Sequence, residues 1–114
     1  EVDCWLTMIK SRWFRSFLDH DARPVLEAVK CPVLLIFGGL DRQVPSDENR
    51  EAMVGALKRG GNSDFSVRTF PTANHLFQSA TTGSPSEYST LEKKFVPGFL
   101  ELLATWILKT ALKK

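Results

Sequence analysis

The sequence predicts an α/β fold in which parallel strands alternate with helices, and three observations lead to this prediction. Residues 31–37 are predicted to form a strand that is apolar without alternation, which is typical of a central parallel strand covered by helices on both faces. Residues 46–60 carry apolar side chains at helical spacing, and residues 65–70 form a second strand. A strand, a helix and a strand at this spacing make a βαβ unit, whose crossover is expected to be right-handed.

Length and composition limit the chain to one globular domain or a part of one. Its 114 residues leave no room for two ordinary domains, and 43% hydrophobic residues is too high for a disordered chain. The net charge is +2 and the basic residues are scattered, so nucleic-acid binding is not predicted. No apolar run is long enough to span a bilayer. The two cysteines form neither a disulfide framework nor a C-x-x-C motif, which leaves the cellular compartment open.

The first element is predicted to be an amphipathic helix over residues 2–18 that ends at residues 19–21, ahead of Arg23-Pro24. A short helical turn over residues 25–29 follows. The aromatic stripe of the first helix suits packing against a core or a partner, and lining of an acyl pocket is the alternative. The apolar residues of this helix are Val2, Trp5, Leu6, Ile9, Trp13, Phe14, Phe17 and Leu18.

Gly38-Gly39 ends the first strand, and the next helix is expected to have Ser46 as its N-cap and to end at Gly60-Gly61. Its buried stripe is predicted to be Ala52, Met53, Ala56 and Leu57.

The second strand alternates in polarity, so one of its faces is expected to be wetter. Residues 78–90 are rich in Ser and Thr and are predicted to be a loop. The last helix is expected to start near Pro97 and to run to about Leu112. Its buried stripe is predicted to be Phe99, Leu102, Leu103, Trp106 and Ile107.

The predicted sheet is incomplete, because a strand like residues 33–37 needs a neighbour at each edge and helices on both faces. The first residue is Glu1 and no leader precedes it, so the chain is expected to begin inside a longer gene product, or after a tag or a processing site. We therefore expect residues 1–114 to form a single partial domain. A missing N-terminal half, or another copy of the chain, would complete the sheet.

Two polar side chains follow the two strands directly and are the candidate catalytic residues. Asp41 lies just past the first strand and His75 just past the second. If the strands are neighbours, both loops emerge at the carboxyl edge of the sheet, where catalytic groups gather in such folds. A carboxylate there can orient an imidazole that acts as a general base. On spacing alone, a turn-forming Asp and a surface-loop His fit the same pattern.

The run from Cys31 to Pro45, followed by a helix, a strand and Asn74-His75, resembles the C-terminal part of the α/β-hydrolase superfamily. It is most similar to bacterial esterases and acyl-peptidase-like serine hydrolases, and the resemblance covers roughly residues 12–110. It implies that Asp41 is the triad acid, in a G-x-x-D-x-x-V-P loop, and that His75 is the triad histidine. The chain order acid, then histidine, is that of these enzymes.

The pattern lacks a nucleophile. No G-x-S-x-G elbow exists in the sequence, and the loop that supplies part of the oxyanion hole is also absent. Ser84 follows the histidine in a polar loop, and Ser46 is better explained as a helix cap. Cys31 and Cys4 are expected to be packed in the interior. We therefore expect a C-terminal fragment of a serine hydrolase, closer to esterases than to peptidases, that supplies the acid and the histidine but not the serine.

Other ligands are not predicted. Asp19-His20-Asp21 is a single acidic and histidine cluster without suitably spaced partners, so it is interpreted as a solvated helix end, and neither metal nor cofactor is expected. The expected partner of the intact protein is a small acyl substrate. The competing hypothesis is a non-catalytic interaction module, or a self-complementing dimer, that pairs through the open sheet edge.

Overall fold

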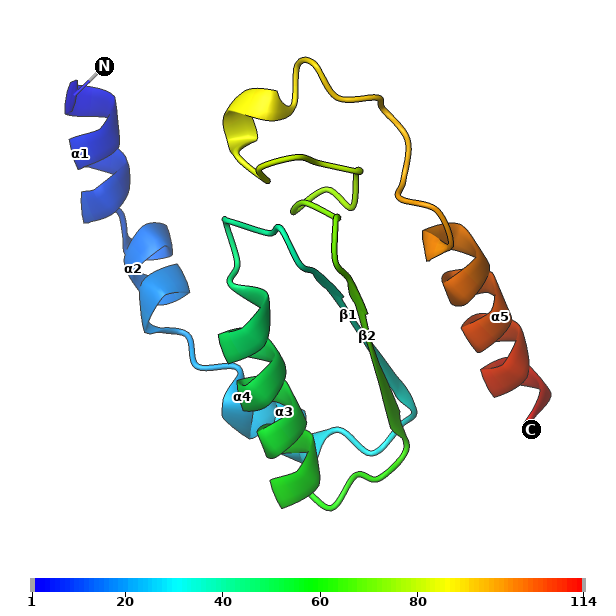
Figure 1. The fold of residues 1–114 in the computed structure, drawn as a ribbon. Coiled ribbons are helices and arrows are strands. Elements are labelled where there is room, and N and C mark those ends of the chain that lie inside the picture. The colour runs from blue at the N-terminus through cyan, green and yellow to red at the C-terminus, as the bar shows by residue number, and fades with distance from the viewer. Residues whose placement is uncertain (1, 114) are drawn as a thin grey trace.

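The computed structural model describes residues 2–113 and contains one parallel sheet of two strands. β1 (Val33–Gly38) pairs with β2 (Phe65–Phe70), and Val33 lies opposite Phe65 in the register. The predicted α/β class and the parallel βαβ unit are confirmed (Figure 1). The helices of the described residues are α1 (Val2–Lys10), α2 (Arg12–Asp19), α3 (Arg23–Ala28), α4 (Ser46–Arg59), the 3-10 turn η1 (Pro85–Glu87) and α5 (Phe99–Leu112).

The core lies between the sheet and the helix that connects its strands. α3 and α4 pack together, and α4 covers one face of the sheet (Figure 1). Leu35 and Phe37 project from β1 onto Leu57 of α4, which is fully buried. Ala56 and Leu57 confirm half of the predicted α4 stripe, whereas Met53 is half-buried. The prediction for Ala52 is wrong, because its side chain is exposed to solvent.

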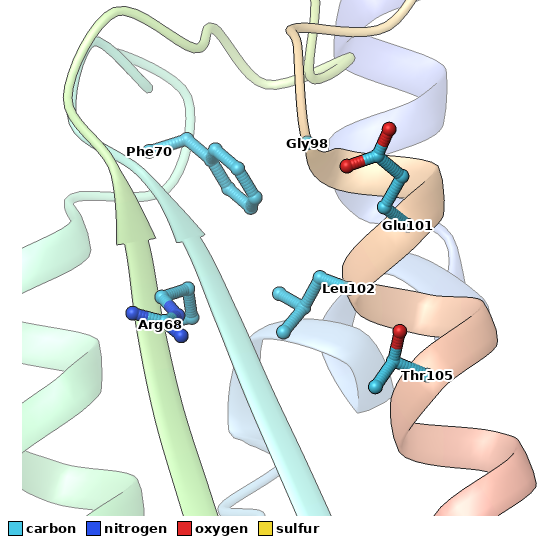
Figure 2. A pocket seen from close by; sticks show the side chains of 6 residues that line it. All are labelled: Arg68, Phe70, Gly98, Glu101, Leu102 and Thr105. Atoms are coloured by element: carbon cyan, nitrogen blue, oxygen red, sulfur yellow. The ribbon is translucent and has the colours of Figure 1, made fainter.

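The opposite face of the sheet is only loosely covered. α5 lies on that side, and an open groove of about 410 Å³ separates it from β2 (Figure 2). The predicted buried stripe of α5 is confirmed only in part, because Phe99, Leu102, Leu103 and Trp106 are half-buried, whereas Ile107 is 55% exposed. The groove is lined by Arg68, Phe70, Gly98, Glu101, Leu102 and Thr105.

The N-terminal region differs from the single helix predicted over residues 2–18. The helix is interrupted at Ser11. The Oγ of this residue accepts a hydrogen bond from the Phe14 N–H (3.1 Å) and donates one to the Met8 carbonyl oxygen (2.7 Å). Such a side chain satisfies a free N–H at the start of a helix, and so it begins α2 as a new element. No residue of α1 or α2 is buried, so their aromatic stripe forms no core within residues 2–113.

Several boundaries also differ from the predictions. α3 begins at Arg23 and includes Pro24 in its first turn, and β1 begins two residues later than predicted. Ser46 is the first residue of α4 rather than its N-cap, because Pro45 occupies that position and no side chain caps the helix. α5 begins at Phe99.

The polar segment 78–90 was predicted to be a loop throughout, but it contains the η1 turn and two isolated β-bridges, at Ser79 and Gln78. None of the helices in the part of the chain that the structure describes is long and apolar enough to cross a membrane.

Candidate functional site

The structure brings Asp41 and His75 together at the carboxyl edge of the sheet. The loops after β1 and β2 lie at the same end of the molecule (Figure 1). Asp41 Oδ2 and His75 Nδ1 are hydrogen-bonded at 2.9 Å. The Asp41 side chain is only 12% exposed, whereas that of His75 is 39% exposed. The imidazole is therefore anchored on its Nδ1 side by a shielded carboxylate and stays partly open to solvent.

Gly38 allows the two loops to approach each other this closely. A Cβ atom at this position would lie 2.6 Å from the Ala73 carbonyl oxygen and 2.7 Å from that of Asn74, both of them backbone atoms. These separations are shorter than van der Waals contact permits, so any other residue would push the loops apart. The same contact is held by a hydrogen bond from the Leu40 N–H to the Ala73 carbonyl oxygen (2.9 Å). A glycine that ends the strand thus also positions the residues on either side of the site.

The Asp41 carboxylate is held by its own loop as well as by His75. Its Oδ1 accepts hydrogen bonds from the backbone N–H groups of Gln43 and Val44, each at 2.9 Å. Partial burial raises the pKa of Asp41, but the hydrogen bonds from Val44, His75 and Gln43 together outweigh burial and hold the pKa below its usual value. Asp41 is therefore ionised at neutral pH and accepts a hydrogen bond from the His75 Nδ1–H.

The lowered pKa of Asp41 predicts a pH-dependent contribution to stability. A carboxylate stabilised in the folded state contributes fully above its ordinary pKa of about 3.9, and the contribution is lost as pH falls through the lowered folded pKa. Asp41→Asn should therefore be less stable than the wild type at neutral pH, and the difference should shrink in acid. Urea unfolding of both proteins at about pH 7 and about pH 3 measures this. A difference that is equal at both pH values would contradict it.

Asn74 organises the loop that carries His75. It is fully buried, and its Oδ1 accepts hydrogen bonds from the N–H groups of Leu76 and Gln78, each at 2.9 Å. Its Nδ2 donates to Gln78 Oε1 (3.3 Å). Sequence reasoning quoted Asn74 beside His75 but assigned it no role. An Asn that bonds the backbone two residues ahead is a recognised turn former, which is the signal that could have identified it.

A cluster of aromatic rings packs the His75 loop against the start of α5. Phe77, which adopts a left-handed φ of 55°, stacks on Phe99 at the start of α5 with ring centroids 4.7 Å apart. Phe70 and Phe95 contact the same ring, at 5.9 and 4.9 Å. The cluster joins the end of β2, the His75 loop and α5. Phe99 is thus one of the residues of the predicted α5 stripe that face the rest of the molecule.

The segment around η1 packs against the Asp41 loop. Gly83 has a φ of +74°, and a Cβ atom there would overlap the Leu40 carbonyl oxygen. The Glu87 carboxylate accepts hydrogen bonds from the N–H groups of Thr82 (2.8 Å) and Gly83 (3.0 Å), which fixes this turn. Tyr88 Oη accepts a hydrogen bond from Gln43 Nε2. Three loops therefore meet at the carboxyl edge of the sheet.

The remaining sequence candidates lie elsewhere or have structural roles. Ser84 is the N-cap of η1 and its Oγ is 2.9 Å from that of Ser86. The predictions for Cys4 and Cys31 are wrong, because both thiols are exposed rather than packed in the interior. Cys31 precedes the N-terminal end of β1, whereas Asp41 and His75 follow the C-terminal ends of the strands.

The Asp19-His20-Asp21 cluster ends α2, with His20 as the C-cap. The side chain of Arg23 donates hydrogen bonds to the Asp21 carboxylate, and these lower the pKa of Asp21 to about 2. Among residues 2–113 no three His, Cys, Asp or Glu side chains form a group that could hold a metal ion.

The model of the family described as "Prolyl oligopeptidase family" matches residues 12–97, a span that contains β1, β2, Asp41 and His75. No curated protein and no solved structure matches the chain.

Proposed function

Because this chain belongs to the prolyl oligopeptidase family, whose members are serine hydrolases of the α/β-hydrolase type, we propose that Asp41 and His75 are the acid and the base of a Ser-His-Asp triad. The reaction is hydrolysis of a carboxylic ester or a related acyl bond. The 2.9 Å hydrogen bond between Asp41 Oδ2 and His75 Nδ1 is the observation that carries the proposal. In a serine triad, the serine hydroxyl approaches the other ring nitrogen of such a pair.

Each residue has a defined task in the mechanism. Asp41 keeps the proton of His75 on Nδ1, so Nε2 is the free base. Nε2 takes the proton of the serine hydroxyl as the serine oxygen attacks the carbonyl carbon, and it then gives this proton to the leaving oxygen or nitrogen. Water repeats the sequence on the acyl-enzyme, which releases the acid and restores the serine. The ionised Asp41 stabilises the imidazolium that forms twice in each cycle.

The serine is proposed to lie outside these 114 residues. No G-x-S-x-G pentapeptide occurs in the sequence, and Ser84 caps a 3-10 turn instead of standing between a strand and a helix. Within residues 2–113, β1 pairs only with β2, which leaves one edge of this largely buried strand without a partner. We therefore propose that the chain is the C-terminal part of the hydrolase domain and that the preceding half supplies further strands and the nucleophile.

A non-catalytic interaction module is the second candidate function, and the open edge of β1 favours it. In that case the partner is another protein, or a second copy of the chain, that adds a strand to β1. It predicts binding without turnover. The Asp41–His75 hydrogen bond then only ties the two loops together.

Turnover by the longer protein that contains this segment separates the two functions. We expect hydrolysis of a small p-nitrophenyl ester, and the matched p-nitroanilide peptide measures how far the activity extends to amides. Pre-treatment with a serine-directed sulfonyl fluoride should abolish both activities. Absence of turnover on both substrates, with a stable complex through the sheet edge, would favour the interaction module. Turnover that the sulfonyl fluoride leaves intact would contradict the serine mechanism.

A further inference from the structure

A groove beside the His75 loop is distinct from the hydrogen-bonded pair and from the groove under α5. Its volume of about 470 Å³ is within the range of small-ligand sites. One wall belongs to the His75 loop and the other to the segment that leads to α5. The lining residues are Leu76, Gln78, Tyr88, Lys93, Lys94 and Phe95.

The apolar part of the groove is held in place and open to solvent. Leu76 follows His75 directly and is 46% exposed, while Phe95 is 48% exposed. The backbone of Leu76 is fixed by its hydrogen bond to buried Asn74 (2.9 Å), and the ring of Phe95 packs on Phe99. The positions of these two exposed apolar side chains are fixed, so an apolar group that covers them would bind with a favourable hydrophobic free energy.

The polar part of the groove carries a net positive charge of one. Lys93 and Lys94 both line it, and Lys94 Nζ pairs with Glu92 Oε1 at 2.9 Å. Both members of that pair are well exposed, so the pair contributes little and can open. Two lysines and one glutamate leave one uncompensated positive charge, and within the described residues Lys93 forms no ion pair. The groove therefore complements a single negative charge.

The groove is also linked to the catalytic loops. Tyr88 lines it, and its hydroxyl accepts a hydrogen bond from the Gln43 side chain. The O–H of Tyr88 is not used in this hydrogen bond, so the hydroxyl can also donate a hydrogen bond to a bound acceptor. The backbone N–H of Gln43 in turn binds Asp41. Tyr88 and Gln43 thus connect the groove to the Asp41–His75 pair through hydrogen bonds.

We propose that this groove binds a part of the substrate that consists of an apolar group and a single carboxylate. Binding there would make the enzyme prefer acyl or peptide substrates with one negative charge. The apolar group covers Leu76 and Phe95, and the carboxylate binds between Lys93 and Lys94. That the ligand of this groove is a substrate rests on the proposed hydrolase function. Binding of the carboxylate requires neither the serine nor turnover, so the two inferences fail separately.

The test is titration of the ¹⁵N-labelled chain with 3-phenylpropionate and with its neutral isostere 3-phenylpropionamide, followed by NMR. We expect the carboxylate to bind about 5- to 10-fold more tightly than the amide, with shifts at Leu76, Gln78 and Phe95. Lys93→Gln/Lys94→Gln should remove this preference. Both positions are exposed, so the fold should be unaffected. The matched control Lys109→Gln/Lys113→Gln, on α5 and its C-cap, should retain it.

Equal affinity for the two compounds, lack of binding of both, or a preference that survives Lys93→Gln/Lys94→Gln would overturn the inference. A carboxylate preference of the chain, together with no turnover by the longer protein that contains it, would support the groove and refute only the hydrolase function. Turnover by the longer protein without a carboxylate preference of the chain would support the hydrolase function and refute only the proposed role of the groove.

Discussion

Replacing His75 with alanine in the longer protein that supplies the serine is expected to lower kcat by up to about 10⁶-fold. Within residues 2–113, the imidazole of His75 is the only base hydrogen-bonded to the Asp41 carboxylate, and without it the serine hydroxyl keeps its proton. KM should change little, because the ring acts on the nucleophile rather than on substrate binding. Steady-state hydrolysis of a p-nitrophenyl ester measures both constants.

The sequence offers a matched control for this variant. His20 is the other histidine of the chain, exposed at the C-cap of α2. His20→Ala should retain wild-type kcat. Comparable activity of His75→Ala and the wild type would remove the triad from the protein, whereas an equal loss in both variants would point to damaged folding.

Replacing Asp41 with asparagine is expected to lower kcat by about 10⁴-fold. The amide can donate to Nδ1, which would stabilise the tautomer with its proton on Nε2, the nitrogen that must act as the base. The backbone N–H groups of Gln43 and Val44 would also lose their charged acceptor. The measurement is kcat over a range of pH, with circular dichroism to verify the fold.

Asp47→Asn is the control for Asp41. Asp47 lies in the first turn of α4, where its side chain is 83% exposed and pairs with Arg50. Its substitution should leave kcat unchanged, because a surface ion pair of this kind contributes little. A kcat of Asp41→Asn within about tenfold of the wild type would show that the hydrogen bond to His75 has no catalytic role.

The elements that the sequence predicts best are those determined by local rules. The unbroken apolar run of β1 and the alternation of β2 identify both strands, and the glycines after α4 identify its end. The break at Ser11 depends on a competition between continuing one helix and capping a second, which hydrophobic spacing cannot resolve. Burial of the α5 stripe is only partial, because an open groove separates this helix from β2. Packing of the α1 and α2 stripe against a partner stays a prediction, since these helices bury no residue within residues 2–113.

The candidate pair could be located from the sequence because strand ends in a parallel sheet share one edge. Asp41 and His75 each follow a strand, so pairing of the strands was enough to bring them together. The supporting residues could not be found in this way. The close approach at Gly38 involves a backbone atom 35 residues away in the chain, and the contact of Tyr88 with Gln43 joins loops that share no local pattern.

The central claim is that the Asp41–His75 pair serves a serine outside these residues, and reaction with a fluorophosphonate, read by intact mass, tests it most directly. We expect no adduct on the folded 114-residue chain and one adduct on the longer protein, lost in His75→Ala. A single stoichiometric adduct on the 114-residue chain that His75→Ala removes would contradict the claim, because a serine within the chain would then be the nucleophile.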